Sequence, residues 1–203
     1  MTKLYLLTDN SSYAKGVANS LSHEEFHIHK HDYEENKMPI INKDALIDKK
    51  VFVAMDQSFI NYSRQVIFNL FRNHKAQFIN VIHPCAIIDH DVELGVNIFI
   101  DSNVSIGAGS MIADNSVILS GTTIMKKCKI GKNTFIDESC TINSDLEIGN
   151  NAYLGKNTHA LSGNIGENTT IEKQNMTVYQ DVPKGTLFVE NIAEPIHYIN
   201  NRD

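Results

Sequence analysis

Residues 82–154 read IHPCAIIDHDVELGVNIFIDSNVSIGAGSMIADNSVILSGTTIMKKCKIGKNTFIDESCTINSDLEIGNNAYL, and an aliphatic residue occupies every sixth position from first to last. Neither an α-helix, with about 3.6 residues per turn, nor a simple alternating strand requires this spacing. A six-residue period is typical of a parallel β-helix, in which each hexad forms one short side of a coil. The stretch predicts such a coil, with these aliphatic anchors pointing inward: Ile82, Ile88, Leu94, Ile100, Ile106, Ile112, Ile118, Ile124, Ile130, Ile136, Ile142, Ile148 and Leu154.

Glycines follow a longer period, of three hexads, which we take as one complete coil. Gly95, Gly131 and Gly149 each come directly after an anchor, and Ala113 fills the remaining place in that series. Because glycine tolerates positive φ, we expect one corner of the coil to pass through these positions. After Leu154 the pattern shifts by one residue, so we expect a shortened corner within 156–164.

Small residues lie two positions before most anchors, where they allow the coil walls to approach. They are Ala86, Ser110, Ser116, Thr122, Cys128, Thr134, Cys140 and Ala152. The odd number of cysteines, with no CxxC spacing, argues against a disulfide framework or a zinc site. Cys128 and Cys140 occupy the small inward position, so we expect them to serve packing.

The overall composition excludes several classes of protein. A chain of 203 residues forms one or two domains. Its net charge of −6 argues against a general nucleic-acid-binding surface. No apolar run reaches the roughly 18 residues of a membrane span, and residues 3–7 are too short for a signal sequence. The sequence predicts a cytoplasmic protein without nucleic-acid or membrane partners.

Residues before the hexads have a different organisation. Apolar strands at 3–8, 26–28, 51–55 and 78–81 alternate with helical patterns at 13–21 and 60–72, which favours a small parallel α/β domain. We therefore expect an α/β domain over 1–80, a β-helix over 81–182 and a C-terminal tail over 183–203.

Alternating histidines form one candidate metal site in this first domain. His27, His29 and His31 would project from one face of a strand. No carboxylate or cysteine completes a ligand set at suitable spacing, so a solvent-facing strand explains them better, and we expect no metal.

The whole chain resembles the bacterial nucleotide-amino-sugar acetyltransferases of the sialic-acid and bacillosamine type. The matching segments are the hexads, NVIHP at 80–84, CKIG at 128–131 and DVPKG at 181–185. The resemblance implies an N-terminal Rossmann-like domain, a left-handed β-helix and a homotrimer with active sites between adjacent β-helices. It also implies acetyl-CoA, or another acyl-CoA, as cosubstrate and a nucleotide-linked amino sugar as acceptor in surface glycan biosynthesis.

The resemblance also assigns residues to these ligands. The acyl-CoA would contact Ser144, whose backbone N–H lies where the family uses a glycine as oxyanion donor, together with Gly163 and Lys184. The nucleotide would contact the first helix N-terminus, at Asn10, Ser11, Ser12 and Tyr13. The family has a glycine-rich loop there, whereas this chain has none; an ordinary helix N-cap at Asp9 or Asn10 is the alternative.

The catalytic position departs from the family pattern. Lys126 and Lys127 replace a histidine followed by an acidic residue, and Phe135 replaces a second histidine. Lys126 could act as a base only if its pKa fell well below about 10.4; a phosphate contact and a solvated corner are the alternatives. His159, in the phase-shifted turn, is a second candidate, which could reach a substrate across the trimer interface.

The loss of the histidine affects amines and hydroxyls differently. An amine that titrates near 8 is partly neutral at physiological pH, whereas a sugar hydroxyl needs a base. Loss of a general base costs about 10²–10⁴ in rate, so positioning and an oxyanion donor could still support transfer. The sequence favours an N-acyltransferase, with a sugar O-acetyltransferase or a catalytically inactive binding or scaffold protein as alternatives.

Overall fold

The computed structural model describes residues 4–8, 15–17, 26–30, 50–55, 62–189 and 196–197. The chain divides into two compact units, Met1–Val81 and Ile82–Asp203. No helix within the described ranges is long and apolar enough to cross a lipid bilayer.

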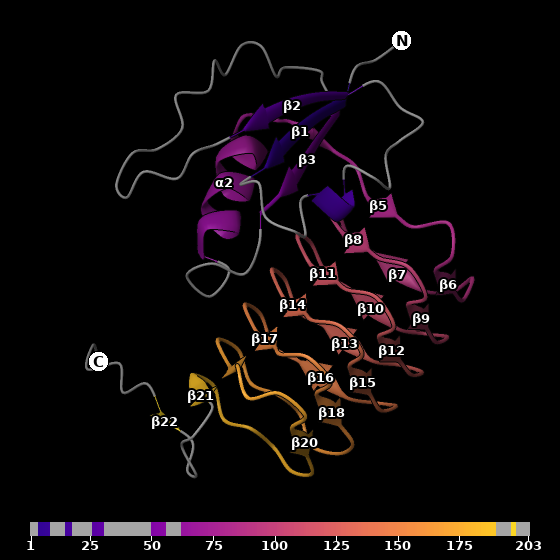
Figure 1. The fold of residues 1–203 in the computed structure, drawn as a ribbon, viewed down its shortest axis with the longest axis vertical. Helices are drawn as coiled ribbons and strands as arrows, with labels where there is room; N and C mark the ends of the chain where they lie inside the picture. Colours follow the sequence, from indigo (N-terminus) through magenta and orange to yellow (C-terminus); the bar gives the residue numbers. More distant parts are fainter. Residues whose placement is uncertain are drawn as a thin grey trace. The chain divides into compact units, whose positions relative to one another are not determined.

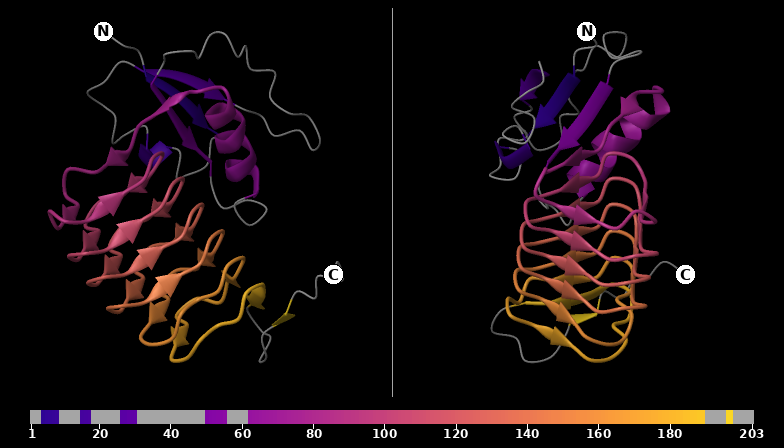
Figure 2. Two further views of the ribbon diagram at one scale, coloured as in Figure 1. Left: turned by 180° about the vertical axis from the view of Figure 1, so that it is seen from behind. Right: turned by 90° about the vertical axis from the view of Figure 1, so that its right-hand side faces the viewer.

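The first unit contains a four-stranded parallel sheet in the order β2-β1-β3-β4. Helix α2 (Tyr62–Asn73) follows β3 in the chain and packs along the sheet (Figures 1 and 2). Its residues Ile67 and Phe71 cover Val51, Val53 and Met55. The strands are β1 (Leu4–Thr8), β2 (Phe26–Lys30), β3 (Lys50–Ala54) and β4 (Gln77–Phe78).

The second unit is a parallel β-solenoid with three sheets (Figure 2). The first sheet contains β5 (Val81–Ile82), β8 (Phe99–Ile100), β11 (Val117–Ile118), β14 (Phe135–Ile136), β17 (Tyr153–Leu154), β19 (Thr170–Ile171), β21 (Thr186–Phe188) and the antiparallel β22 (Ile196–His197). The second contains β6 (Ile87–Ile88), β9 (Ser105–Ile106), β12 (Thr123–Ile124), β15 (Thr141–Ile142), β18 (His159–Ala160) and β20 (Thr177–Val178). The third contains β7 (Glu93–Leu94), β10 (Met111–Ile112), β13 (Lys129–Ile130) and β16 (Glu147–Ile148).

The anchors form the core of the solenoid. From Ile100 to Leu154 each anchor is at most 2% exposed, which confirms the inward direction predicted from the hexads. Burying each of these side chains contributes about 1.5–3 kcal/mol. The first three anchors are more exposed, and Ile82 is 40% exposed, because the first coil has a neighbouring coil on one side only.

The glycines after the anchors do not have the conformation that we expected. Positive φ occurs two residues later in each coil, at Asn97, Asn115, Asn133 and Asn151, and not at the glycines. The glycines are required for space instead. A Cβ on Gly131 would lie 2.6 Å from the backbone nitrogen of Asn150 in the next coil.

An asparagine ladder stabilises the corner that follows these glycines. Each asparagine from Asn97 to Asn151 donates a side-chain hydrogen bond to the next coil, with lengths from 2.7 to 3.1 Å, and Asn168 is the last acceptor. Asparagine suits the position because it adopts the left-handed conformation more readily than most residues and because its amide both donates and accepts. The ladder runs through Asn97, Asn115, Asn133, Asn151 and Asn168.

The predicted one-residue shift in the hexad pattern is present, and it falls in a shorter segment than the predicted 156–164. Asn143 bonds to Leu161 at a separation of 18 residues, whereas Glu147 bonds to Asn164 at a separation of 17. One residue is therefore lost between Leu161 and Asn164. Coil pairing continues into the predicted C-terminal tail, 183–203, because β21 pairs in parallel with β19.

Candidate functional site

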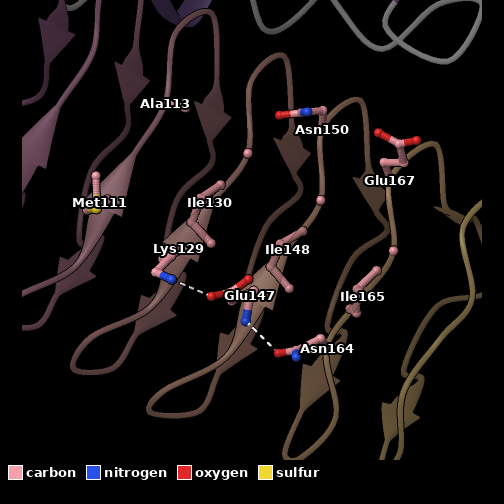
Figure 3. A pocket seen from close by; sticks show the side chains of 13 residues that line it. Met111, Ala113, Lys129, Ile130, Glu147, Ile148, Asn150, Asn164, Ile165 and Glu167 are labelled. Atoms are coloured by element: carbon pink, nitrogen blue, oxygen red, sulfur yellow. Dashed lines mark hydrogen bonds and ion pairs between the residues drawn. The ribbon is translucent and has the colours of Figure 1, made fainter.

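A groove with a volume of about 480 Å³ lies on the outer surface of the third sheet (Figure 3). Met111, Lys129 and Glu147 lie in register along it, because their strands pair at intervals of one coil. Small residues after the anchors leave the space on one side of the groove: Ala113, Gly131, Gly149 and Gly166. The same close approach between coils that requires glycine there thus also makes the surface concave.

Polar groups lie along the floor of this groove. Lys129 Nζ forms an exposed ion pair with Glu147 Oε1, and the backbone N–H of Glu147 donates to Asn164 Oδ1 at 2.8 Å (Figure 3). An exposed pair of this kind contributes little stability, about 0–1 kcal/mol, so both side chains are free to exchange partners. Sequence reasoning missed Lys129 and Glu147; their separation of 18 positions, one coil apart, was the signal that could have found them.

Lys126 lies at the corner between the second and third sheets. Its side chain is exposed, as is that of Lys127, whose φ is 57°. The backbone of this turn is held by neighbouring coils: Lys127 N–H donates to Ala108 O, and Lys126 O accepts from Asp145 N–H, both at 2.9 Å. An exposed ammonium lacks the desolvation that a lysine base needs, so the geometry favours a solvated corner or a contact to an anionic ligand.

The Ser144 N–H lies one coil further along the same corner, and it already has an acceptor. It donates to Asn143 Oδ1 at 3.0 Å, while Asn143 Nδ2 donates to Leu161 O at 3.0 Å. Ser144 can therefore serve as an oxyanion donor only if the Asn143 carboxamide turns away. The side chain that covers this N–H was not foreseen from the sequence.

Gly163 and Lys184 lie at the two different corners of the coil that flank the third sheet, Gly163 before its strands and Lys184 after them. Gly163 has a φ of 83°, and a Cβ there would lie 2.0 Å from the carbonyl carbon of Gln180. Close packing between coils therefore requires this glycine. Lys184 is exposed and follows Val182, which bridges Ile165 at the far end of the sheet. The structure thus groups Lys126, Ser144 and Gly163 on one corner and separates Lys184 from them.

His159 lies on β18, in register with Thr141 and Thr177 on the second sheet. It belongs to the coil that contains the phase shift, as expected, and the residue lost from the pattern follows it, after Leu161. The histidine is half-buried, and its backbone N–H donates to Met176 O at 2.8 Å. Lys126 lies in the turn that follows β12, a strand of the same sheet two coils earlier.

A second polar cluster, at the corner between the first and second sheets, was not predicted. Asp137 is 6% exposed and accepts hydrogen bonds from the Tyr153 hydroxyl at 3.2 Å and from the Glu138 N–H at 2.8 Å. Burial and the neighbouring Asp137 carboxylate raise the pKa of the Tyr153 hydroxyl well above its ordinary value. Tyr153 also packs against Phe135, with 5.9 Å between ring centroids.

The cysteines serve packing, as predicted for Cys128 and Cys140. Both are buried, whereas Cys85 is exposed. Burial raises the pKa of the Cys140 thiol to about 12 and also raises the pKa of Cys128, whose Sγ lies 3.0 Å from Asn143 O. In the part of the chain that the structure describes, no three histidine, cysteine or acidic side chains are placed to hold a metal ion.

Several candidate residues lie outside the described residues. Asn10, Ser11, Ser12 and Tyr13 are among them, as is His31. Strand β2 carries His27 and His29, whose side chains are not described.

This chain was compared with protein families, curated sequences and solved structures, and the solved structures match the largest part of it. A protein-family profile described as the GMPPB C-terminal domain matches residues 78–162, less than half of the chain. No curated protein sequence gives a match.

Three solved structures illustrate the likeness. PerB from Caulobacter crescentus, in complex with CoA and GDP-perosamine, has a TM-score of 0.79 and 24% identity, covering 90% of this chain and 92% of PerB. The acetyltransferase domain of PglB from Neisseria gonorrhoeae, in complex with acetyl coenzyme A, has a TM-score of 0.79 and 19% identity, covering 96% and 99% of the two chains. WeeI from Acinetobacter baumannii has a TM-score of 0.59 and 19% identity, covering 96% and 100%. At these identities the likeness establishes the fold.

Proposed function

We propose that this protein transfers an acetyl group from acetyl-CoA to the amine of a nucleotide-linked amino-deoxy sugar. The observation that carries the proposal is the likeness to PerB, which extends over nine tenths of both chains and therefore includes both units. PerB holds CoA and GDP-perosamine, and the PglB domain holds acetyl coenzyme A. Shared architecture over the whole chain makes the same pair of ligand classes the simplest explanation of this fold.

The finer features of the family belong to the same proposal. We infer a left-handed coil, a Rossmann-like first unit and a homotrimer with sites between adjacent β-helices, acting in surface glycan biosynthesis in the cytoplasm. The first unit would bind the nucleotide, with Asn10, Ser11, Ser12 and Tyr13 as candidate contacts. A mass measurement by light scattering tests the trimer, and a monomer at micromolar concentration would argue against a site shared between subunits.

The groove on the third sheet fits the elongated arm of an acyl-CoA. Backbone and small side chains line one side of it, and Lys129 can offer its ammonium to a phosphate by leaving its exposed pair with Glu147. Lys126 and Lys184 offer exposed ammonium groups at the two edges of the same sheet. Acetyl-CoA, when bound, supplies the acetyl group as a thioester.

The chain's own groups act on the thioester oxygen. Ser144 N–H stabilises the negative charge that develops there, once Asn143 Oδ1 releases it. The neutral amine forms the new C–N bond as the C–S bond breaks, and its extra proton passes to solvent. Gly163 lies one coil further along this corner, where it lets the chain pass close to Gln180 in the next coil. With Lys126 exposed and His159 on another strand, the proposal needs no enzymic base, which favours amines over hydroxyls.

A thiol-release assay tests the proposal. Purified protein is incubated with acetyl-CoA and matched pairs of nucleotide sugars that carry an amine or a hydroxyl at one position. We expect thiol release with an amino sugar and little with its hydroxyl counterpart. Equal release with both would favour an O-acetyltransferase, and failure to bind acetyl-CoA and every nucleotide sugar would favour a scaffold protein.

A further inference from the structure

Asp137, at the corner between the first and second sheets, carries a buried charge without a counter-ion. It is 6% exposed, and its two hydrogen-bond donors, the Tyr153 hydroxyl and the Glu138 N–H, are both neutral. The Nζ of Lys156 pairs with Glu138 Oε2 at 3.1 Å instead. Across the ranges that the structure describes, no cation pairs with Asp137. Burying a carboxylate without a cationic partner is costly, which points to a positive charge from outside this chain.

A second buried polar group lies beside Tyr153, on the outer face of the same sheet. Thr170 is 3% exposed and is in register with Tyr153, while its neighbour Ile171 lies in the core. Within the described residues, Thr170 Oγ1 has no hydrogen-bond partner. Because buried hydroxyls are nearly always hydrogen-bonded, this oxygen independently indicates a polar ligand near Tyr153.

Asp137 cannot serve the acetyl group that Ser144 of the same chain would hold. The two residues lie at opposite ends of one side of the coil, with β15 between them. Such a side is on the order of 15–20 Å long, at about 3.3 Å per residue. The reacting atoms of an acyl transfer must approach to about 3–3.5 Å. A role for Asp137 in this reaction therefore requires a second copy of the chain.

The homotrimer proposed above can bring the two corners together. Asp137 and Ser144 belong to one coil, formed by β14, β15 and β16, so they lie at nearly the same height along the solenoid. In a closed ring with parallel solenoids, groups at equal height meet where two copies adjoin. The Asp137 corner of one copy would then face the Ser144 corner of the next.

We infer that Asp137 of one copy completes the site at Ser144 of its neighbour, where its carboxylate stabilises the positive charge that forms on the acceptor nitrogen. The inference rests on the proposed function for the reaction. The nitrogen lone pair forms the C–N bond, the C–S bond breaks, and its electron pair leaves on sulfur. The extra proton on nitrogen passes to Asp137 and then to solvent. Transfer to an amine can proceed without a base, and Asp137 accelerates it.

Asp137→Asn tests the carboxylate in the thiol-release assay with a nucleotide-linked amino sugar. We expect kcat to fall by about 10²–10⁴ with little change in either KM, as for a lost base. Glu138→Gln, which alters the adjacent exposed carboxylate, is the matched control and should keep wild-type kcat. Tyr153→Phe keeps the carboxylate but removes its hydroxyl donor, and kcat should fall about tenfold. Wild-type kcat in Asp137→Asn would overturn the inference.

Thermal unfolding separates this role from a structural one. Asp137→Asn removes an uncompensated buried charge and keeps the shape of the side chain, so the Tm of the ligand-free protein should stay or rise. A lower Tm together with unchanged kcat would make Asp137 a structural residue. If Asp137→Asn does not fold, Tyr153→Phe supplies the kinetic test, and its unchanged kcat would count against the inference.

Complementation between two inactive variants tests the contribution of the neighbouring copy. Asp137→Asn and Ser144→Pro, which lacks the backbone N–H, are co-expressed and purified as mixed oligomers. If one copy supplies each group, about a quarter of the sites in randomly mixed rings combine both intact groups, so thiol release should return. If both groups act within one chain, every site stays defective. Activity no higher than that of the separate variants would overturn the shared site.

Failure of this inference is distinguishable from failure of the proposed function. Thiol release by wild-type protein with unchanged kcat in Asp137→Asn removes Asp137 and leaves the proposed function intact. Absence of thiol release by wild-type protein with every amino sugar removes the proposed function and the role of Asp137 together.

Discussion

Asn143 Oδ1 accepts a 3.0 Å hydrogen bond from the backbone N–H of Ser144, the group proposed to stabilise the thioester oxyanion. Donor and competing acceptor are thus neighbours in one turn, and Asp145, the next residue, has a φ of 62°. A turn with positive φ at its third residue accepts proline at its second, which is the position of Ser144. Proline can therefore remove the N–H with little change in the backbone.

Ser144→Pro tests this donor. We expect kcat to fall by about 10²–10³, the usual cost of losing one oxyanion donor, with little change in the KM for acetyl-CoA. Ser144→Ala keeps the N–H and is the matched control, which should retain kcat. Equal kcat values in the two variants, measured by thiol release, would remove Ser144 from the mechanism.

Lys126→Ala tests whether the exposed corner supplies a base. Because Lys126 is exposed, we expect most of the activity to remain and the rate to rise with pH as the substrate amine loses its proton. If Lys126 contacts a phosphate, KM should rise while kcat changes little. A fall in kcat of about 10² or more with unchanged KM would identify Lys126 as the base. The same loss in His159→Asn would assign the base to β18.

Asn133 provides a test of the asparagine ladder. It accepts from Asn115 at 2.7 Å and donates to Asn151 at 3.0 Å, with a φ of 57°. Asn133→Ala should lower the free energy of unfolding by about 2–4 kcal/mol, through two lost hydrogen bonds and a strained backbone. Asn133→Gly removes the same bonds without the strain, so it should be about 1 kcal/mol more stable than the alanine variant. Urea unfolding measures both, and equal stability of the two would show that the left-handed backbone adds no cost.

Cys140 should make the stability of the solenoid depend on pH. Burial raises the pKa of its thiol in the folded protein from 9.0 to about 12. The unfolded chain therefore loses this proton first, so stability is present below pH 9 and falls as pH rises from about 9 to about 12. The loss is on the order of a few kcal/mol at the upper end. Urea unfolding of Cys140→Ala should show a smaller decrease over that range than wild type, with Cys85→Ala, which removes an exposed thiol, as control. An identical decrease in wild type and Cys140→Ala would contradict this prediction.

The core could be predicted from the hexads because the same spacing is repeated in every coil. A parallel β-solenoid buries an aliphatic residue at every sixth position in one continuous core. Ile106, Ile124 and Ile142 therefore lie where the pattern placed them. The role of the glycines was misjudged for a physical reason. A glycine is compatible both with positive φ and with close approach, and only the distance from Gly131 to Asn150 in the next coil separates the two.

The candidate site was less accessible to sequence reasoning, because it depends on contacts between coils. The family resemblance drew attention to the Ser144 N–H, but the side chain of Asn143 that covers it is a local detail without a spacing signal. The pair of Lys129 and Glu147 could have been found from its separation of 18 residues. The burial of Arg64 in helix α2 became visible only in the folded structure, since the sequence alone does not show that a charged residue is buried.

The destination of the acetyl group tests the central proposal most directly. Acetyl-CoA labelled with carbon-13 at the acetyl carbonyl is incubated with the protein and a nucleotide-linked amino sugar, and carbon-13 NMR follows the label. We predict that the label moves from the thioester to an amide carbonyl on the sugar, at a rate that depends on protein concentration. A label that remains in the thioester, or that appears only as an ester or free acetate, would contradict N-acetyl transfer.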